Sequence, residues 1–270
     1  MLKTILASLL TLTTLVADPI PVIDRTNSGS SPPKFRKFDD LRASGSAQFS
    51  ENEFKGLLKE LNNPKNLYIL DLRNESHGFI NGDAVVSYVP RDWGNRGLSP
   101  QEAELNEKRW LASFPLGSKT TFYRIAEHND DDQNIQSEPF DVDILSVSDE
   151  KSLVESYGAH YVRIRVVDHE APSTGARAAF IKLIKDLPQD AWLHIHCRGG
   201  AGRTTTFLLI CDILKNGKNK PLKEMIERQH LSGGSNLLDT QKQPWKVPFI
   251  REKIQFIETF YNDMPTMPTY

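Results

Sequence analysis

The sequence WLHIHCRGGAGRTTTF, residues 192–207, decides which fold this chain is expected to adopt. Apolar Leu193 and Ile195 alternate with other side chains, a period typical of a short sheet strand. From Phe207 onward, apolar residues recur with helical spacing until Gly217, which is suited to end a helix. We therefore predict a strand that closes at Cys197, a glycine-rich turn and a helix.

The turn combines a thiol, glycines and an arginine, with five residues between Cys197 and Arg203. Backbone N–H groups of such a turn point toward one centre, and the dipole of the following helix adds positive potential there. These surroundings favour the thiolate form of a cysteine, so Cys197 is the predicted nucleophile. Arg203 offers a planar fork to two phosphate oxygens, and the Thr204 hydroxyl is the predicted partner of the thiol. The predicted backbone of this phosphate loop comprises Arg198, Gly199, Gly200, Ala201 and Gly202.

A second chemical residue follows an earlier strand. Residues 161–167 are rich in β-branched side chains and lead to Asp168, and a helical pattern then connects them to the strand at 192. Strands linked in this way pair in parallel, so their carboxyl ends meet at one sheet edge. Asp168 is therefore a candidate general acid for the leaving alkoxide, a role that contributes roughly 10² to 10⁴-fold. The alternative is an aspartate that only caps the turn before Pro172.

Two histidines flank these catalytic candidates. His169 is predicted to hydrogen-bond the leaving oxygen or a neighbouring phosphate, although packing alone would also explain it. His196 is predicted to be a structural partner beneath the loop, because a thiolate that is already stabilised needs no base.

Several motifs together resemble a known family. His196, Cys197, Arg203 and Thr204 form a signature that resembles the protein tyrosine phosphatase superfamily. The wider chain resembles the bacterial branch of phosphatase-like phytases, also called cysteine phytases or myo-inositol polyphosphate phosphatases. The stretches that carry this resemblance are residues 35–36, 71–78, 92–95, 161–164, 168–169, 187–194, 228–230, 245–246 and 251–253. Their common order along most of the chain makes the resemblance far more specific than the loop alone.

The resemblance implies an α/β fold with a phosphatase-like core, in which helices flank a central, mainly parallel sheet. A small partial β-barrel is expected within about residues 85–143. The implied activity is hydrolysis of inositol polyphosphates such as phytate through a cysteinyl-phosphate. The substrate-binding residues expected on this basis are Arg36, Asp92, His169, Arg198, Lys246, Arg251 and Lys253. For Arg36 a solvated basic surface is the alternative, and Arg198 departs from the acidic or uncharged residue expected there, adding positive charge at the rim.

No cofactor or metal is expected, because Arg203 and the loop N–H groups would supply the stabilisation that a metal gives elsewhere. Glu75 and His77 lack the spacing of a helical zinc motif and an evident third ligand, so they are interpreted as structural polar residues. The acidic run at 130–138 is interpreted as a solvated loop.

The composition limits the classes of partner that this chain is expected to bind. The chain has 270 residues, 39% hydrophobic and 25% charged, and a formal net charge of -2. That charge argues against a generally basic surface that coats nucleic acid. Residues 198–253, however, contain eleven Lys or Arg and five Asp or Glu. This excess indicates a concave, positively charged surface around the loop. The expected partner is a small polyphosphorylated inositol, and the oligomeric state stays open.

The domain prediction has three parts. Residues 1–17 place Lys3 before an apolar run too short to span a bilayer, which is typical of a secretory signal peptide; a structural N-terminal helix is the alternative. Residues 18–47, rich in Pro, Ser and Gly, are predicted to be a flexible lead-in, and residues 48–270 the catalytic domain. The expected location is periplasmic or secreted, with no membrane contact after cleavage. Cys211 is expected to be a buried small hydrophobe rather than a disulfide partner.

Other functions remain open from the sequence. The same chemistry fits a phosphotyrosine or phosphoinositide phosphatase, which relative activity on phytate and a phosphotyrosine peptide would distinguish. A catalytically inactive phosphate-binding module is disfavoured by intact Cys197, Arg203 and Asp168. A sulfurtransferase that carries a persulfide on Cys197 is a weaker alternative, because it would not need Asp168.

Overall fold

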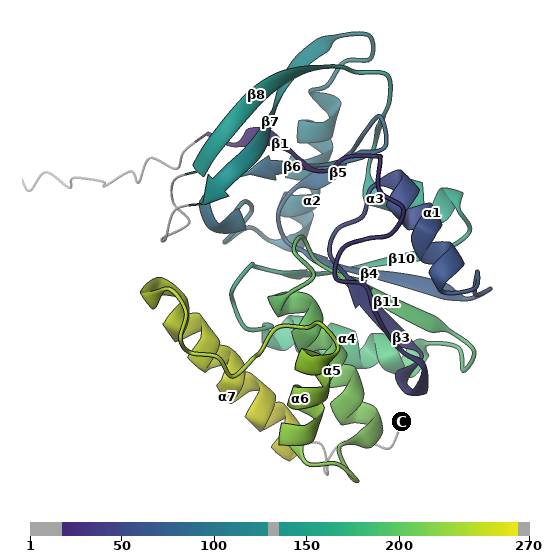
Figure 1. The fold of residues 1–270 in the computed structure, drawn as a ribbon, viewed down its shortest axis with the longest axis vertical. Helices are drawn as coiled ribbons and strands as arrows, with labels where there is room; N and C mark the ends of the chain where they lie inside the picture. Colours follow the sequence, from purple (N-terminus) through teal and green to yellow (C-terminus); the bar gives the residue numbers. More distant parts are fainter. Residues whose placement is uncertain (1–17, 129–134, 264–270) are drawn as a thin grey trace, which may run out of the picture.

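The computed structural model describes residues 18–128 and 135–263. Two sheets lie one above the other, with a group of helices below the lower sheet (Figure 1). The predicted signal peptide at 1–17 and most of the acidic run, residues 129–134, lie outside the described residues.

The lower sheet has five strands in the order β10-β4-β11-β3-β2. They are β2 (Arg36–Phe38), β3 (Ala43–Ser46), β4 (Leu67–Arg73), β10 (His160–Val166) and β11 (Trp192–His196). Neighbours from β10 to β3 pair in parallel, and only β2 is antiparallel. The predicted central, mainly parallel sheet is confirmed.

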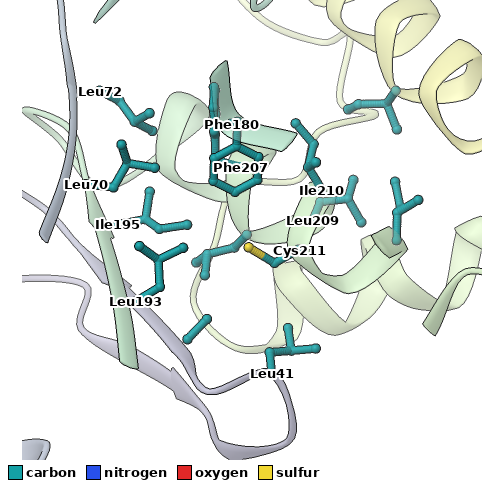
Figure 2. Close-up of a cluster of buried hydrophobic side chains, with 14 of the residues drawn as sticks. Leu41, Leu70, Leu72, Phe180, Leu193, Ile195, Phe207, Leu209, Ile210 and Cys211 are labelled. Atoms are coloured by element: carbon teal, nitrogen blue, oxygen red, sulfur yellow. The ribbon is translucent and has the colours of Figure 1, made fainter. Parts of the chain in front are cut away.

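Helices cover both faces of this sheet, because its central strands are apolar on both sides. Leu193 and Ile195 belong to one hydrophobic cluster, whereas Trp192 belongs to another on the opposite face. The first face carries α4 (Thr174–Asp186), α5 (Gly202–Asn216), α6 (Leu222–Leu231) and α7 (Val247–Asp263). The second face carries α1 (Glu51–Glu60) and α3 (Glu150–Ser156). Figure 2 shows part of the first cluster, with Leu193 and Ile195 on the sheet side and Ile210 on the helix side.

The upper sheet has six strands in the order β8-β7-β1-β6-β5-β9. They are β1 (Ile20–Arg25), β5 (His77–Ile80), β6 (Asp83–Tyr88), β7 (Lys119–His128), β8 (Ile135–Asp143) and β9 (Val147–Ser148). Helix α2 (Pro100–Ala112) lies between β6 and β7 in the chain. The β-rich unit therefore extends beyond the predicted 85–143, and its closure as a partial barrel stays a prediction. Short 3-10 turns are η1 (Asp39–Leu41), η2 (Pro90–Asp92) and η3 (Pro244–Lys246).

The prediction of a flexible lead-in over residues 18–47 is wrong. This segment supplies β1 to the upper sheet, where Val22 pairs with Val86, and supplies β2 and β3 to the lower sheet. Val22 and Ala43 are buried, so the segment is held by apolar packing as well as by its ladders. The N-terminal part of the chain thus joins both sheets.

Two further findings concern membrane-spanning helices and the cysteine thiols. Within the described ranges, no helix is both long enough and apolar enough to cross a membrane. Cys197 and Cys211 are both free thiols, and Cys211 is buried in the cluster of Figure 2, as predicted.

Phe207 provides a test of this core. Its ring is fully buried and meets the ring of Phe180 edge-on, with centroids 4.9 Å apart. We expect Phe207→Ala to lower the free energy of unfolding by about 3–5 kcal/mol, because it leaves a cavity under the phosphate loop. Denaturant unfolding followed by circular dichroism measures this. Leu231→Ala, at a side chain 78% exposed, is the control and should change stability by less than about 0.5 kcal/mol; equal effects would contradict the assigned core.

Candidate active site

The phosphate loop links the end of β11 to the start of α5. Gly200 has a φ of 62°, and a Cβ placed on it would lie 2.3 Å from the backbone nitrogen of Ala47. Only glycine fits such a position without distortion. The backbone N–H of Gln48 donates to the carbonyl of Arg198 at 3.0 Å, which fixes the loop against the residues that follow β3.

Cys197 lies at the base of a cavity of about 350 Å³. Its side chain is buried, and the Thr204 hydroxyl donates to its sulfur at 3.1 Å. Because Thr204 is in the first turn of α5, the sulfur also faces the positive end of that helix. The cavity is also lined by Asp168, His169, Lys246 and Lys253. The structure therefore brings seven of the predicted residues, Arg203 included, to one place.

Arg203 is oriented by Glu75. Its Nη1 lies 2.8 Å from Oε2 of Glu75 and its Nη2 lies 3.0 Å from Oε1, a two-pronged pairing that fixes the guanidinium plane. Burial favours the neutral form of Glu75, but the charges of Arg203 and Arg73 outweigh it and hold its pKa well below its usual range. Glu75 was predicted to be a structural residue, but its pairing with Arg203 was not predicted. The only signal was its place within the family-like stretch 71–78.

Asp168 follows β10 and reaches the same arginine. Its Oδ1 lies 3.0 Å from Nε of Arg203, and its Oδ2 lies 3.2 Å from Nε2 of His169. Burial opposes ionisation of Asp168, but the charges of Arg203 and His169 outweigh it, so its pKa is lower than usual. The indole N–H of Trp93 donates to the carbonyl of Asp168 at 3.1 Å. Sequence reasoning missed this positioning contact.

His169 occupies a constrained position in the same loop. Its φ is 69°, and its ring lies edge-on to Trp245 with centroids 4.8 Å apart. Burial lowers the pKa of His169, which favours the neutral ring. A neutral imidazole has one donor and one acceptor nitrogen, so it suits a hydrogen bond to a phosphate or to a leaving oxygen.

Helix α7 and the turn before it supply the cationic wall. Lys253 is 8% exposed and lines the cavity, and a Cβ on Gly202 would lie 3.5 Å from its Nζ. Burial lowers the pKa of Lys253. Lys246 lines both this cavity and a neighbouring one. Arg251, in contrast, is exposed and does not line either cavity, since it lies two residues from Lys253 on the helix and points elsewhere.

The neighbouring cavity, about 620 Å³, contains Arg198 and Asp92. Nη1 of Arg198 lies 2.5 Å from Oδ1 of Asp92, and its Nε lies 2.8 Å from Oδ1 of Asp24. Arg198 was expected to add positive charge at the rim, and the structure shows that two carboxylates pair with that charge. Burial is the main reason that the pKa of Asp92 rises to about 6. Asp24 was missed because its segment was interpreted as flexible.

Arg36 lies beneath the loop and not in the cavity. Its Nη1 donates to the carbonyl of Gly200 at 2.9 Å, and its Nη2 donates to the Thr205 hydroxyl at 3.0 Å. The side chain is buried, and burial lowers its pKa to about 10. Arg36 was expected to contact substrate. Its guanidinium is instead turned inward to loop atoms, so it supports the loop.

A buried polar cluster lies behind the site. Nε2 of His196 lies 2.6 Å from Oε1 of Glu150, beneath the loop. Ligand-type atoms of Asp71, His77 and Glu150 lie within 4.8 Å of one another. These groups already pair with each other, and Asp71 also accepts from the Tyr161 hydroxyl at 2.7 Å. His77 thus has protein partners on both ring nitrogens, whereas Nδ1 of His196 has no hydrogen-bond partner among the described residues.

Comparison with known proteins identifies the family. The family model for protein tyrosine phosphatase-like phytases, described as inositol hexakisphosphate, matches residues 70–215. A phytase of this kind from Bdellovibrio bacteriovorus has a TM-score of 0.81 and 34% identity, covering 97% of this chain and 94% of that chain. The myo-inositol phosphatase of Mitsuokella multacida was solved in complex with myo-inositol-(1,3,4,5)-tetrakisphosphate. It has a TM-score of 0.84 and 32% identity, and the match covers 95% of this chain and 48% of that chain.

A curated relative is more distant. Effector protein hopD2 of Pseudomonas syringae is 29% identical over 226 residues, which are 83% of this chain and 48% of that protein. The chain thus spans about half the length of this relative and of the Mitsuokella protein. Because the family model covers more than half of the chain and the Bdellovibrio phytase aligns over nearly its whole length, this chain belongs to the protein tyrosine phosphatase-like phytases.

Proposed function

We propose that this chain is a phosphomonoesterase that removes phosphate from myo-inositol polyphosphates such as phytate through a cysteinyl-phosphate. The observation that carries the proposal is the cavity lined by Cys197 and Asp168, with the Asp168 carboxylate 3.0 Å from Nε of Arg203. Family membership and the inositol tetrakisphosphate in the Mitsuokella complex support the substrate class.

The first step transfers the phosphoryl group to sulfur. The Cys197 thiolate attacks phosphorus, the new S–P bond forms and the P–O bond to the inositol oxygen breaks. Arg203 and the loop N–H groups stabilise the negative charge on the phosphoryl oxygens. Asp168 gives its proton to the departing alkoxide, which leaves as a hydroxyl.

The second step releases phosphate. Water attacks the phosphorus of the cysteinyl-phosphate while the Asp168 carboxylate takes a proton from that water. The S–P bond breaks, inorganic phosphate forms and the thiolate returns, hydrogen-bonded by the Thr204 hydroxyl at the observed distance of 3.1 Å. The step restores the protonated Asp168 that the next turnover needs.

The cationic wall supports a substrate with several phosphates. Lys246 and Lys253 line the cavity from one side, next to the loop that would hold the reacting phosphate. A substrate with one phosphate leaves these ammonium groups unused, whereas a polyphosphate brings anions to them. His169 faces both cavities and adds a hydrogen-bonding group between the two.

We also infer export from the composition of residues 1–17, which places a lysine before an apolar run of signal-peptide length. A periplasmic or extracellular enzyme would meet phytate from the surroundings of the cell. Fractionation of the expressing cells, with activity measured in each fraction, tests this part.

The activity itself is tested by a time course of phosphate release from inositol hexakisphosphate, with the intermediates separated. We expect stepwise loss of phosphate, and Cys197→Ser should lower kcat by at least about 10⁴-fold because the nucleophile is lost. Inositol hexakisphosphate should still bind the Ser variant, as measured by calorimetry. Faster turnover of a phosphotyrosine peptide or a phosphoinositide than of the hexakisphosphate would contradict the proposed substrate class.

Asp168→Asn tests the general acid. We expect kcat on inositol phosphates to fall roughly 10² to 10⁴-fold, because their alkoxide leaving group needs a proton. p-Nitrophenyl phosphate, whose leaving group is stable without a proton, should lose far less in the first step. Values of kcat/KM on both substrates, which report the steps up to departure of the alcohol, give the comparison, and an equal loss on the two would show that Asp168 has another role in that step.

The pH profile follows from the low pKa of Asp168 in the free protein. The acid must be protonated to act, so its active fraction falls as pH rises above that pKa. We expect kcat/KM on an inositol phosphate to decline toward alkaline pH, and Asp168→Asn should flatten this decline relative to the unaltered protein on the same substrate. A decline that is identical in the two proteins would assign it to another group.

A further inference from the structure

A chain of alternating charges extends from the catalytic arginine to the upper sheet. Arg203 pairs with Glu75, Glu75 with Arg73 at 2.9 Å, and Arg73 with Asp24 at 3.1 Å. Asp24 pairs with Arg198, which in turn pairs with Asp92. Three arginines therefore meet three carboxylates, and their formal charges cancel.

Three members of this chain, Arg198, Asp24 and Asp92, line the cavity next to that of Cys197. Arg198 directly follows the nucleophile, yet its side chain turns toward β1 and η2, where Asp24 and Asp92 hold it. The guanidinium also lies over the Tyr88 ring, 5.0 Å from its centroid. A cation beside the phosphate loop is thus fixed and neutralised by residues that belong to the upper sheet and its connecting turn.

The wall beside α7 is also cationic. Lys253 on α7 has no hydrogen bond or ion pair with any residue in the described part of the chain, and it faces the cavity with Lys246. The cavity that Arg198 lines also has Lys34, Arg91 and Lys246 in its lining, so both walls carry positive charge. The charge of Arg198 is the part that the carboxylates of Asp24 and Asp92 balance.

We propose that Asp24 is a positioning residue that, together with Asp92, holds Arg198 against β1 and η2 and so weakens the attraction of this wall for substrate phosphates. This inference rests on the proposed function. An ionised carboxylate repels a phosphate but accepts a hydrogen bond from a hydroxyl. Asp24 and Asp92 would thereby limit how readily fully phosphorylated inositol binds.

Asp24→Asn is the decisive variant, because it removes one negative charge and keeps the shape. We expect KM for inositol hexakisphosphate to fall by about three- to tenfold relative to KM for p-nitrophenyl phosphate. Arg198→Gln should change the same ratio in the opposite direction, because both carboxylates then lack their cation. A purely structural role would not improve binding of the polyphosphate in one variant and weaken it in the other.

Asp141→Asn is the matched control. Asp141 lies exposed on β8, so the substitution makes the same change in net charge far from the site, and the KM ratio should stay constant. Circular dichroism checks that each variant is folded. If Asp24→Asn fails to fold, Arg198→Gln decides alone, and an unchanged ratio overturns the inference. An unchanged or raised ratio in folded Asp24→Asn also overturns it.

The experiment separates this inference from the proposed function. If the unaltered protein hydrolyses p-nitrophenyl phosphate but not inositol hexakisphosphate, the proposed substrate is wrong. Inhibition of p-nitrophenyl phosphate hydrolysis by the hexakisphosphate then measures the same binding. Stronger inhibition of Asp24→Asn than of the unaltered protein would still support the role of Asp24, and equal or weaker inhibition would overturn it.

Discussion

The structure depends on one buried ion pair, between Arg203 at the start of α5 and Glu75 after β4. A buried charge is strongly destabilising without a partner, and a buried pair is tolerated only with good geometry. Here both prongs of the guanidinium are used, at 2.8 and 3.0 Å, and Nη1 also donates to the carbonyl of Val166 at 3.2 Å. This pair therefore ties the phosphate loop to the strands that carry Glu75 and Asp168. It also leaves Nε of Arg203 directed at the Asp168 carboxylate.

The parts of the fold that the sequence predicted are those in which neighbouring residues determine the structure. Alternating Leu193 and Ile195, the glycines after Cys197 and the helical spacing from Phe207 are all local, and the observed strand, loop and helix follow them. The parallel sheet follows in turn, because two strands joined through a helix pair in parallel by a right-handed crossover. Asp168 was found in this way from topology, without knowledge of any contact.

The parts that could not be predicted depend on distant partners. Strand β1 has only a short apolar alternation beside Ser, Gly and Pro, and its partner β6 lies some 60 residues later. Charged residues present a related difficulty, since a sequence gives the charge of Arg198 or Arg36 but not the direction of its side chain. Arg251 is different. Helical spacing from Lys253 already places it on another side of α7, so that signal was available in the sequence.

In the proposed mechanism, the pairing of Asp168 with Arg203 links substrate binding to acid catalysis. In the free protein Arg203 helps to keep Asp168 ionised, which is the wrong state for an acid. A phosphate that engages Arg203 compensates its charge and brings negative charge beside Asp168, and both effects raise the pKa of a carboxyl group. The proton is therefore held most firmly when a substrate is present to receive it. If one cation bound the phosphate and a different cation paired with the acid, this coupling would be absent. The sharing of Arg203 therefore accounts for the position of Asp168 against it.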